Sequence, residues 1–133
     1  MRYLLDTDIC IYIAKHKPPR AFERFERMHP GDVGMSVVTY LELVYGAYKS
    51  RHVEANLDRI VQLSDLIPVS PLDSSAAAHY GKLRAHLERA GSQIGAYDLL
   101  IAAHALSLGF VLVTNNVREF SRMPGLRVEN WVE

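Results

Sequence analysis

The chain has 133 residues, of which 49% are hydrophobic and 23% charged, and this length allows one domain with a hydrophobic core but not two. Lys and Arg together number 15, as do Asp and Glu, so the net charge gives no indication of a nucleic-acid partner. The single cysteine, Cys10, excludes an internal disulfide and suits a reducing compartment, and no apolar run approaches the roughly 20 residues of a membrane span. We therefore expect one domain over residues 1–133, a cytoplasmic location, no signal peptide and no membrane partner.

In the first half of the chain, short apolar runs alternate with patterns typical of helices. Strands are predicted at residues 3–5 and 33–35, and helices through about residue 14, over 21–27, from residue 37 and over 53–61. Asp8 or Thr7 can cap the first of these helices, and Ser36 can cap the third. The third helix carries apolar residues at helical spacing, which predict its buried face: Val37, Leu41, Val44, Tyr45 and Tyr48.

The second half of the chain continues the same alternation. Strands are predicted at residues 67–69, 110–113 and 127–128, and helices over 76–87 and 99–106. The last helix is apolar almost all round, which indicates that it is buried. Buried strands without polar alternation, placed between helices, are typical of a parallel sheet covered on both faces. We therefore predict an α/β fold of three layers, α/β/α, with a short and mainly parallel central sheet.

Four of the apolar runs deliver an acid or an amide side chain where the run ends: Asp6, Glu42, Asp98 and Asn116. In open α/β sheets, ligands bind beyond the carboxyl ends of the strands, so residues far apart in the sequence can converge there. A carboxylate among core residues is costly unless it is paired, and no Lys or Arg lies within three residues of Glu42 or Asp98. The compensating charge that this pattern indicates is a divalent metal ion.

Each acid also has a purely structural explanation. Asp6 could be a helix N-cap, although Asp8 is the better candidate for that role, which leaves Asp6 free to point into the cleft. Glu42 could be a surface position between two apolar stripes. Asp98 lies in the first turn of a helix, where the macrodipole by itself favours a carboxylate.

The donor types limit the choice of metal. Three carboxylates and an amide are oxygen donors of the kind that Mg²⁺ prefers, and Mn²⁺ would serve similarly. Zinc is disfavoured because Cys10 is alone and the histidines show no paired ligand spacing. Three histidines lie in predicted helices among small or apolar residues and are expected to be packing or surface groups: His79, His86 and His104.

The order and spacing of four segments make the chain resemble the PIN-domain ribonucleases, and among them the VapC toxins of bacterial toxin–antitoxin pairs. The segments are residues 4–8, 36–46, 95–102 and 113–120, which together run nearly end to end. The resemblance implies a parallel sheet flanked by helices and metal-dependent endonucleolytic cleavage of RNA, in several branches of tRNA. It also implies a homodimer and a cognate antitoxin that holds the toxin inactive. By this resemblance Asp6, Glu42 and Asp98 match the acidic metal-binding positions.

The chain departs from this family at one position. The fourth acidic position is often Asp, whereas the matching residue here is Asn116, so the site loses one negative charge. Asp8 or Glu119 could supply the missing carboxylate. We expect Asp6, Glu42 and Asp98 to hold one Mg²⁺ or Mn²⁺ while Asn116 positions water. In-line attack of that water would leave 5′-phosphate and 3′-hydroxyl ends.

Two other functions stay open at this point. The Asp6-Thr7-Asp8 segment also resembles the start of haloacid-dehalogenase-type phosphatases, although the later acidic pair of those enzymes is missing. The chain could also be a non-catalytic RNA- or protein-binding module. For the antitoxin, we expect a groove beside Phe22 and Phe25. Four tyrosines are expected to be core or dimer contacts before base-stacking groups: Tyr12, Tyr45, Tyr48 and Tyr97.

Overall fold

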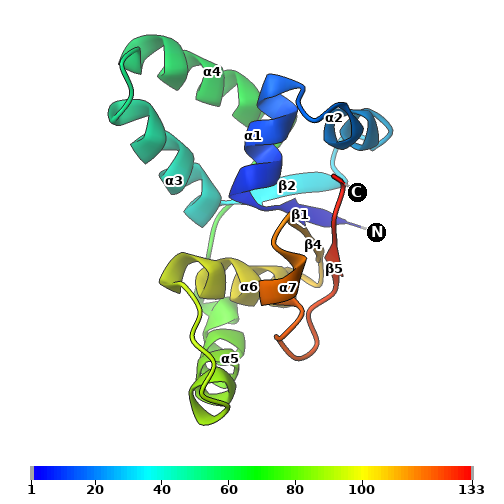
Figure 1. Ribbon diagram of the computed structural model, residues 1–133, viewed down its shortest axis with the longest axis vertical. Coiled ribbons are helices and arrows are strands. Elements are labelled where there is room, and N and C mark those ends of the chain that lie inside the picture. The colour runs from blue at the N-terminus through cyan, green and yellow to red at the C-terminus, as the bar shows by residue number, and fades with distance from the viewer. Residues whose placement is uncertain (1, 133) are drawn as a thin grey trace.

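Five short parallel strands form the centre of the computed structural model, which describes residues 2–132 (Figure 1). The strand order across the sheet is β3-β2-β1-β4-β5. The strands are β1 (Tyr3–Leu5), β2 (Val33–Ser36), β3 (Val69–Ser70), β4 (Val111–Val113) and β5 (Val128–Glu129). Because β1 pairs in parallel with both β2 and β4, the residue that follows β1 lies in the middle of the carboxyl edge of the sheet.

Helices cover both faces of this sheet. They are α1 (Thr7–Lys15), α2 (Pro19–Glu26), α3 (Val37–Tyr48), α4 (Val53–Leu66), the 3₁₀ turn η1 (Ser74–Ala76), α5 (Ala77–Arg89), α6 (Ala96–Leu108) and α7 (Val117–Phe120). In Figure 1, α1 to α4 lie on one side of the sheet and α5 to α7 on the other. The predicted three-layer α/β/α fold is therefore confirmed. None of the helices in residues 2–132 is long and apolar enough to cross a membrane.

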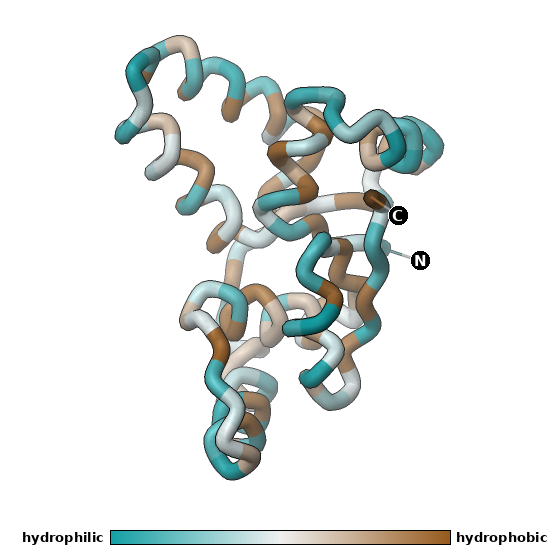
Figure 2. Tube along the Cα trace, in the orientation of Figure 1, coloured by the Kyte–Doolittle hydropathy of each residue, from teal (hydrophilic) through white to brown (hydrophobic). Residues whose placement is uncertain are grey.

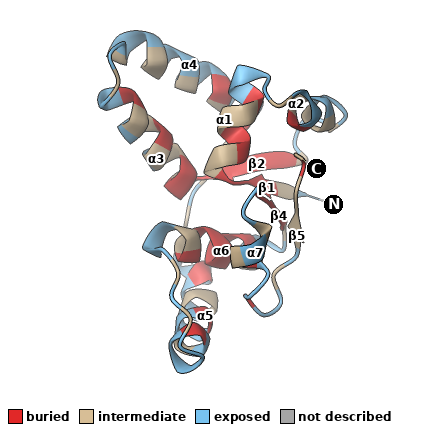
Figure 3. Cartoon of the chain, in the orientation of Figure 1, coloured by how far each residue is buried: buried red, intermediate tan, exposed pale blue. Residues whose placement is uncertain are grey.

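The core has two halves, one on each face of the sheet. Leu4 and Leu112 pack against α5 and α6, whereas Leu5 and Val113 pack on the face covered by α1, α3 and α4. This division follows from the strand geometry, because successive side chains point to opposite faces. Buried segments accordingly gather on β1, β2, β4 and α6 in Figure 3, and the tube in Figure 2 is largely hydrophilic around α2.

The predicted boundaries agree with the observed elements at most positions. Ser36 caps α3, and its hydroxyl accepts a hydrogen bond from the Val38 N–H at 3.1 Å. As predicted, α6 is buried on nearly all sides, and it ends at Gly109, whose φ of 70° lies in the left-handed region that glycine tolerates. The third strand begins later than predicted, at Val69, because α4 extends to Leu66.

The prediction for the buried face of α3 is wrong. Leu41, Tyr45 and Tyr48 are 62%, 65% and 64% exposed. The residues that α3 buries lie on the opposite stripe: Val38, Thr39, Leu43 and Ala47. Since α3 is apolar on several sides, periodicity alone could not tell which stripe the sheet would cover.

Candidate functional site

Asp6 connects the central strand to the first helix. It follows β1 directly and is 7% exposed. One carboxylate oxygen, Oδ1, accepts the Thr7 N–H at 2.7 Å, and the other, Oδ2, accepts the Thr114 hydroxyl at 2.8 Å. Burial raises the pKa of Asp6, the two hydrogen bonds lower it, and the charge of Glu119 raises it further.

The expectation that Asp8 rather than Asp6 caps α1 is wrong. Asp6 has the extended backbone of an N-cap residue, with φ of −72° and ψ of 165°, because the chain leaves β1 there. Asp8 lies inside the first turn, where its carboxylate accepts the Ile9 N–H at 2.8 Å. Burial and the neighbouring charge of Asp6 raise the pKa of Asp8 to about 6. Asp6 therefore caps the helix and also faces the other acids.

Glu42 is hydrogen-bonded to Thr7, the residue that follows Asp6. The Thr7 hydroxyl donates to Glu42 Oε1 at 3.1 Å and lies 3.4 Å from the hydroxyl oxygen of Thr39, which is buried in the same helix as Glu42. Burial raises the pKa of Glu42, the Thr7 hydrogen bond lowers it, and the charge of Asp6 raises it again. Sequence reasoning treated Thr7 only as a possible cap, although its position beside Asp6 already put a hydroxyl at the strand end.

Asp98 and Glu119 form a carboxyl pair. Asp98 lies in the first turn of α6 and Glu119 in α7. Burial, the hydrogen bond with Glu119, and the charges of Glu119, Asp6 and Glu42 together raise the pKa of Asp98 to about 7. The repulsion between two adjacent carboxylates disfavours the ionised form of Asp98.

Asn116 contacts Glu119 and Thr114 at the edge of the acidic cluster. It is exposed, and its side-chain Nδ2 donates to Glu119 Oε2. Its backbone N–H donates to the Thr114 hydroxyl oxygen at 3.0 Å. The same Thr114 hydroxyl donates to Asp6 Oδ2. Asn116 thus orients Glu119, and Thr114 connects the end of β4 to Asp6.

The four acids have little cationic compensation from the protein. Among residues 2–132, the ion pair nearest to this cluster joins Arg122 Nη2 to Glu119 Oε1 at 4.0 Å, and none of the three ion pairs includes Asp6, Glu42 or Asp98. Each of these three has its pKa raised by another acid of the cluster, which is the expected effect of unneutralised like charges. The all-oxygen donor set fits a hard divalent cation.

The side chains are not arranged as a closed metal site. Within residues 2–132, no three His, Cys, Asp or Glu side chains converge closely enough to hold an ion. Their spacing is that of mutually repelling carboxylates braced by Thr7, Thr114 and Asn116. A cation entering between them would relieve that repulsion and draw the carboxylates together.

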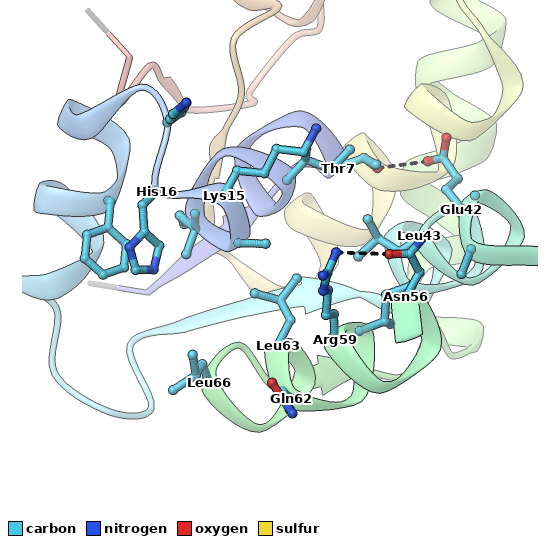
Figure 4. A pocket seen from close by; sticks show the side chains of 18 residues that line it. Thr7, Lys15, His16, Glu42, Leu43, Asn56, Arg59, Gln62, Leu63 and Leu66 are labelled. Atoms are coloured by element: carbon cyan, nitrogen blue, oxygen red, sulfur yellow. Dashed lines mark hydrogen bonds between the residues drawn. The ribbon is translucent and has the colours of Figure 1, made fainter. Parts of the chain in front are cut away.

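A groove of about 810 Å³ borders the acidic cluster without containing it. It lies between α1, α3 and α4, and it reaches the cluster at Thr7 and Glu42 (Figure 4). Its lining is largely apolar and includes Phe22, Leu63 and Leu66. In addition to Glu42, its charged members are Lys15, Lys17 and Arg59. Phe22 lines the groove as expected, but Phe25 does not.

Comparison with known proteins identifies the fold. The PIN domain family model matches residues 3–126. The tRNA(fMet)-specific endonuclease VapC of Shigella flexneri is 46% identical over 131 residues, covering 98% of each chain, and Ribonuclease VapC2 of Haemophilus influenzae is 42% identical over 132 residues, covering 99% of each. The chain belongs to the PIN-domain family and, within it, to the VapC group.

Solved structures of VapC proteins agree with this assignment. The chain superposes with a TM-score of 0.91 on DNA-bound VapBC from Salmonella typhimurium, which is 44% identical and covers 98% of both chains. The TM-score is 0.92 for VapBC-1 of nontypeable Haemophilus influenzae, which is 40% identical and covers 100% of both. Both relatives belong to VapBC assemblies.

In this PIN-domain chain, the predicted site residues differ in how directly they interact with one another. Asp6, Glu42 and Asp98 lie within electrostatic range of one another, and Glu119 joins them through Asp98. Asp8 lies close enough to Asp6 for the charge of Asp6 to raise its pKa. Asn116 touches the cluster only at Glu119 and Thr114.

Proposed function

We propose that the chain is a metal-dependent endoribonuclease and the toxin of a toxin–antitoxin pair, with tRNA as its substrate. The observation that carries the proposal is a set of four carboxylates at the carboxyl edge of a VapC fold, of which Asp6, Glu42 and Asp98 form no ion pair among residues 2–132. The substrate class is taken from the relatives that are named as tRNA(fMet)-specific endonucleases. A tRNA substrate implies that the protein acts in the cytoplasm.

The metal in this proposal is Mg²⁺, with Mn²⁺ as a substitute, held by Asp6, Glu42 and Asp98. When bound, such an ion supplies charge stabilisation to the phosphodiester. Thr7 and Thr114 keep the Glu42 and Asp6 carboxylates oriented before the ion and the substrate arrive. This bracing lowers the cost of assembling the site, as second-shell hydrogen bonds do at other metal centres.

Glu119 takes the place of the fourth acid in this proposal, and Asn116 becomes its support. Glu119 contacts Asp98 and accepts the Asn116 amide, so it is a carboxylate available to take the proton of the attacking water. The water oxygen forms the new bond to phosphorus, the bond from phosphorus to O3′ breaks, and the 3′-oxygen leaves as a hydroxyl. The products are a 5′-phosphate and a 3′-hydroxyl.

An antitoxin segment is the proposed occupant of the groove between α1, α3 and α4. Its apolar lining suits the apolar face of a peptide helix, and its Thr7–Glu42 end opens onto the acids. The VapC relatives of known structure are found in VapBC assemblies. A segment that filled the groove to this end would therefore cover Glu42 and block the substrate.

We also propose that the chain forms a homodimer through the exposed stripe of α3. Leu41, Tyr45 and Tyr48 place large apolar side chains on one surface, and such a surface is typical of an interaction site. Light scattering of the purified protein should give twice the mass of the chain, and Tyr45→Glu should give the mass of one chain.

The decisive experiment incubates antitoxin-free protein with a tRNA pool, with Mg²⁺ and with a chelator, and maps the cleaved ends. The proposal expects cuts that need the metal and leave 5′-phosphate ends. RNA binding without any cleavage in Mg²⁺ or Mn²⁺ would favour the non-catalytic binding module instead.

A further inference from the structure

A buried histidine with no role in the proposed reaction lies on α6, the helix that carries Asp98. His104, on α6, is 1% exposed, and its Nδ1 atom is 2.7 Å from the hydroxyl oxygen of Ser36, which is fully buried. Among the described residues, the other ring nitrogen, Nε2, has no hydrogen-bond partner. His104 is therefore a packing group, which is one of the two expected roles, and it also makes a specific polar contact over 68 residues of sequence.

The hydrogen bonds around Ser36 determine which group donates in the contact between Ser36 and His104. The Ser36 hydroxyl oxygen already accepts the Val38 N–H in its role as the cap of α3. Its own hydrogen is then free to donate to Nδ1 of His104, which places the imidazole proton on Nε2. Burial lowers the pKa of His104, and the carbonyl of Pro71 and the charge of Asp73 raise it by smaller amounts, so the ring is neutral at neutral pH.

The pair joins the two helices that carry opposing acids. Ser36 lies six residues before Glu42 at the start of α3, and His104 lies six residues after Asp98 on α6. The two helices are in contact, and Val38 packs in the same core cluster as α6. At the site itself, the interaction between Glu42 and Asp98 is repulsive, since the charge of Glu42 raises the pKa of Asp98.

From this placement we infer that the Ser36–His104 hydrogen bond is a positioning contact that fixes the separation of Glu42 and Asp98 and thereby sets the affinity of the site for a divalent cation. The inference rests on the proposed function, because it assumes that these two carboxylates share an ion. Thr7 ties Glu42 to the Asp6 side of the site, whereas the Ser36–His104 pair ties α3 to α6 against the carboxylate repulsion. Neither Ser36 nor His104 touches the acids in any described hydrogen bond.

The test compares the Mn²⁺ affinity of antitoxin-free full-length variants by isothermal titration calorimetry, with Tm measured in parallel. His104→Phe fills the cavity but has no acceptor for the Ser36 hydroxyl, and we expect it to weaken Mn²⁺ binding roughly tenfold, the lower end of what second-shell substitutions cost. His104→Asn carries an amide at the position of Nδ1 and should recover most of the affinity. A drop in kcat for His104→Phe with an unchanged KM for RNA would agree with this positioning role.

A matched control separates positioning from general loss of stability. Leu87→Ala removes a buried side chain of α5 that belongs to the same core cluster, so it should lower Tm at least as much as His104→Phe. We expect its Mn²⁺ affinity to stay within about twofold of the wild type. If Leu87→Ala weakens Mn²⁺ binding as much as His104→Phe does, the effect is one of stability and the inference is overturned.

Ser36→Gly provides a second route if His104→Phe does not fold. Glycine is tolerated at a helix N-cap, so this variant removes the partner of His104 at little cost to the cap. It should show the same loss of Mn²⁺ affinity, and an unchanged affinity overturns the inference. A wild-type protein that binds no Mn²⁺ and cuts no RNA would instead overturn the proposed function. If the wild type binds Mn²⁺ and cuts RNA, and the Ser36 and His104 variants have the same Mn²⁺ affinity, only the positioning role is overturned.

Discussion

Two carboxylates at the carboxyl edge of the sheet have opposite surroundings. Glu129 lies at the end of β5, where its Oε1 accepts the Arg24 Nη2 at 3.1 Å and the Trp131 Nε1 at 3.3 Å. The Arg24 guanidinium also lies over the Trp131 ring, 5.4 Å from its centroid. Asp6 follows β1, and its carboxylate accepts hydrogen bonds from the Thr114 hydroxyl and the Thr7 backbone N–H, with no cation among the described partners.

The difference shows that a strand-end acid is not by itself a functional group. Glu129 is neutralised by a cation of the same chain, so its pairing ties α2 to the C-terminal segment and leaves no charge for a ligand. Asp6 is oriented but not neutralised, and the neighbouring acids raise its pKa or have theirs raised by it. Orientation without neutralisation is the arrangement that a cation-binding site needs.

The strongest test of this difference is to remove the charge of Asp6 and the charge of Glu129 in separate variants. Asp6→Asn should abolish cleavage, by roughly 10³-fold or more, while the fold persists because Asn is also a good N-cap. Glu129→Gln should leave cleavage within about twofold of the wild type and lower stability by at most about 1 kcal/mol, since its ion pair is partly exposed. The measurements are tRNA cleavage in Mg²⁺ and thermal unfolding by circular dichroism. Undiminished cutting by Asp6→Asn would sink the site assignment.

Glu119 tests whether the fourth acid takes part in the chemistry. Glu119→Gln keeps the shape of the side chain and should lower kcat roughly 10²-fold, because the proposed proton acceptor is lost. Asn116→Ala should lower kcat by only about tenfold, since it removes the support of Glu119 and not the carboxylate. Single-turnover cleavage rates separate the two effects. Equal cleavage rates for Glu119→Gln and the wild type would show that Glu119 is not the fourth functional group of the site, and would leave Asn116 or Asp8 for that role.

The bracing of Asp6 should be visible in stability. Thr114→Val leaves Asp6 Oδ2 without its buried hydroxyl donor and should destabilise the protein by roughly 1–3 kcal/mol. Urea unfolding of the metal-free protein measures the change. The matched control is Thr7→Val, whose lost partner Glu42 is only half-buried and whose cost should be smaller. A larger loss for Thr7→Val would contradict the assigned roles.

The pH dependence of stability should report the carboxyl pair, with a modest effect. The folded-state pKa of Asp98, about 7, lies above the ordinary aspartate value of 3.8, so the folded protein holds a proton that the unfolded chain releases. Its ionisation therefore costs stability progressively as pH rises from about 4 to about 7, by roughly 1 kcal/mol after allowance for solvent screening. Relative to the wild type, Asp98→Asn should gain stability across this window in chelator. A gain that is constant with pH would exclude the pair as its source.

Parts of this fold could be predicted because local patterns carry the information. The alternation of short apolar strands with helices predicted the parallel sheet, and the almost uniformly apolar sequence of α6 predicted its burial. Asp6, Glu42 and Asp98 stood out because a charge among apolar residues needs a reason. Their chemical roles stay predictions that the substitutions above test.

Other parts could not be predicted because they depend on which surfaces meet. The buried stripe of α3 was assigned to the wrong side, since apolar residues lie on both sides and only the sheet decides which one is covered. Asp6 proved to be the cap because β1 ends at Leu5, three residues before Asp8, which is the better capping residue by sequence context. Glu119 could not be placed, because nothing local distinguishes a solvated helix turn from a position beside Asp98.

By itself, then, the sequence determined the class of fold and the three acids most in need of a partner, because burial and charge are properties of each segment. The tertiary structure alone decided which donors brace those acids, which fourth carboxylate joins them, and that Ser36 meets His104. Those contacts join elements far apart in the chain, and only the packing of helices on both faces of one sheet brings them within hydrogen-bonding distance.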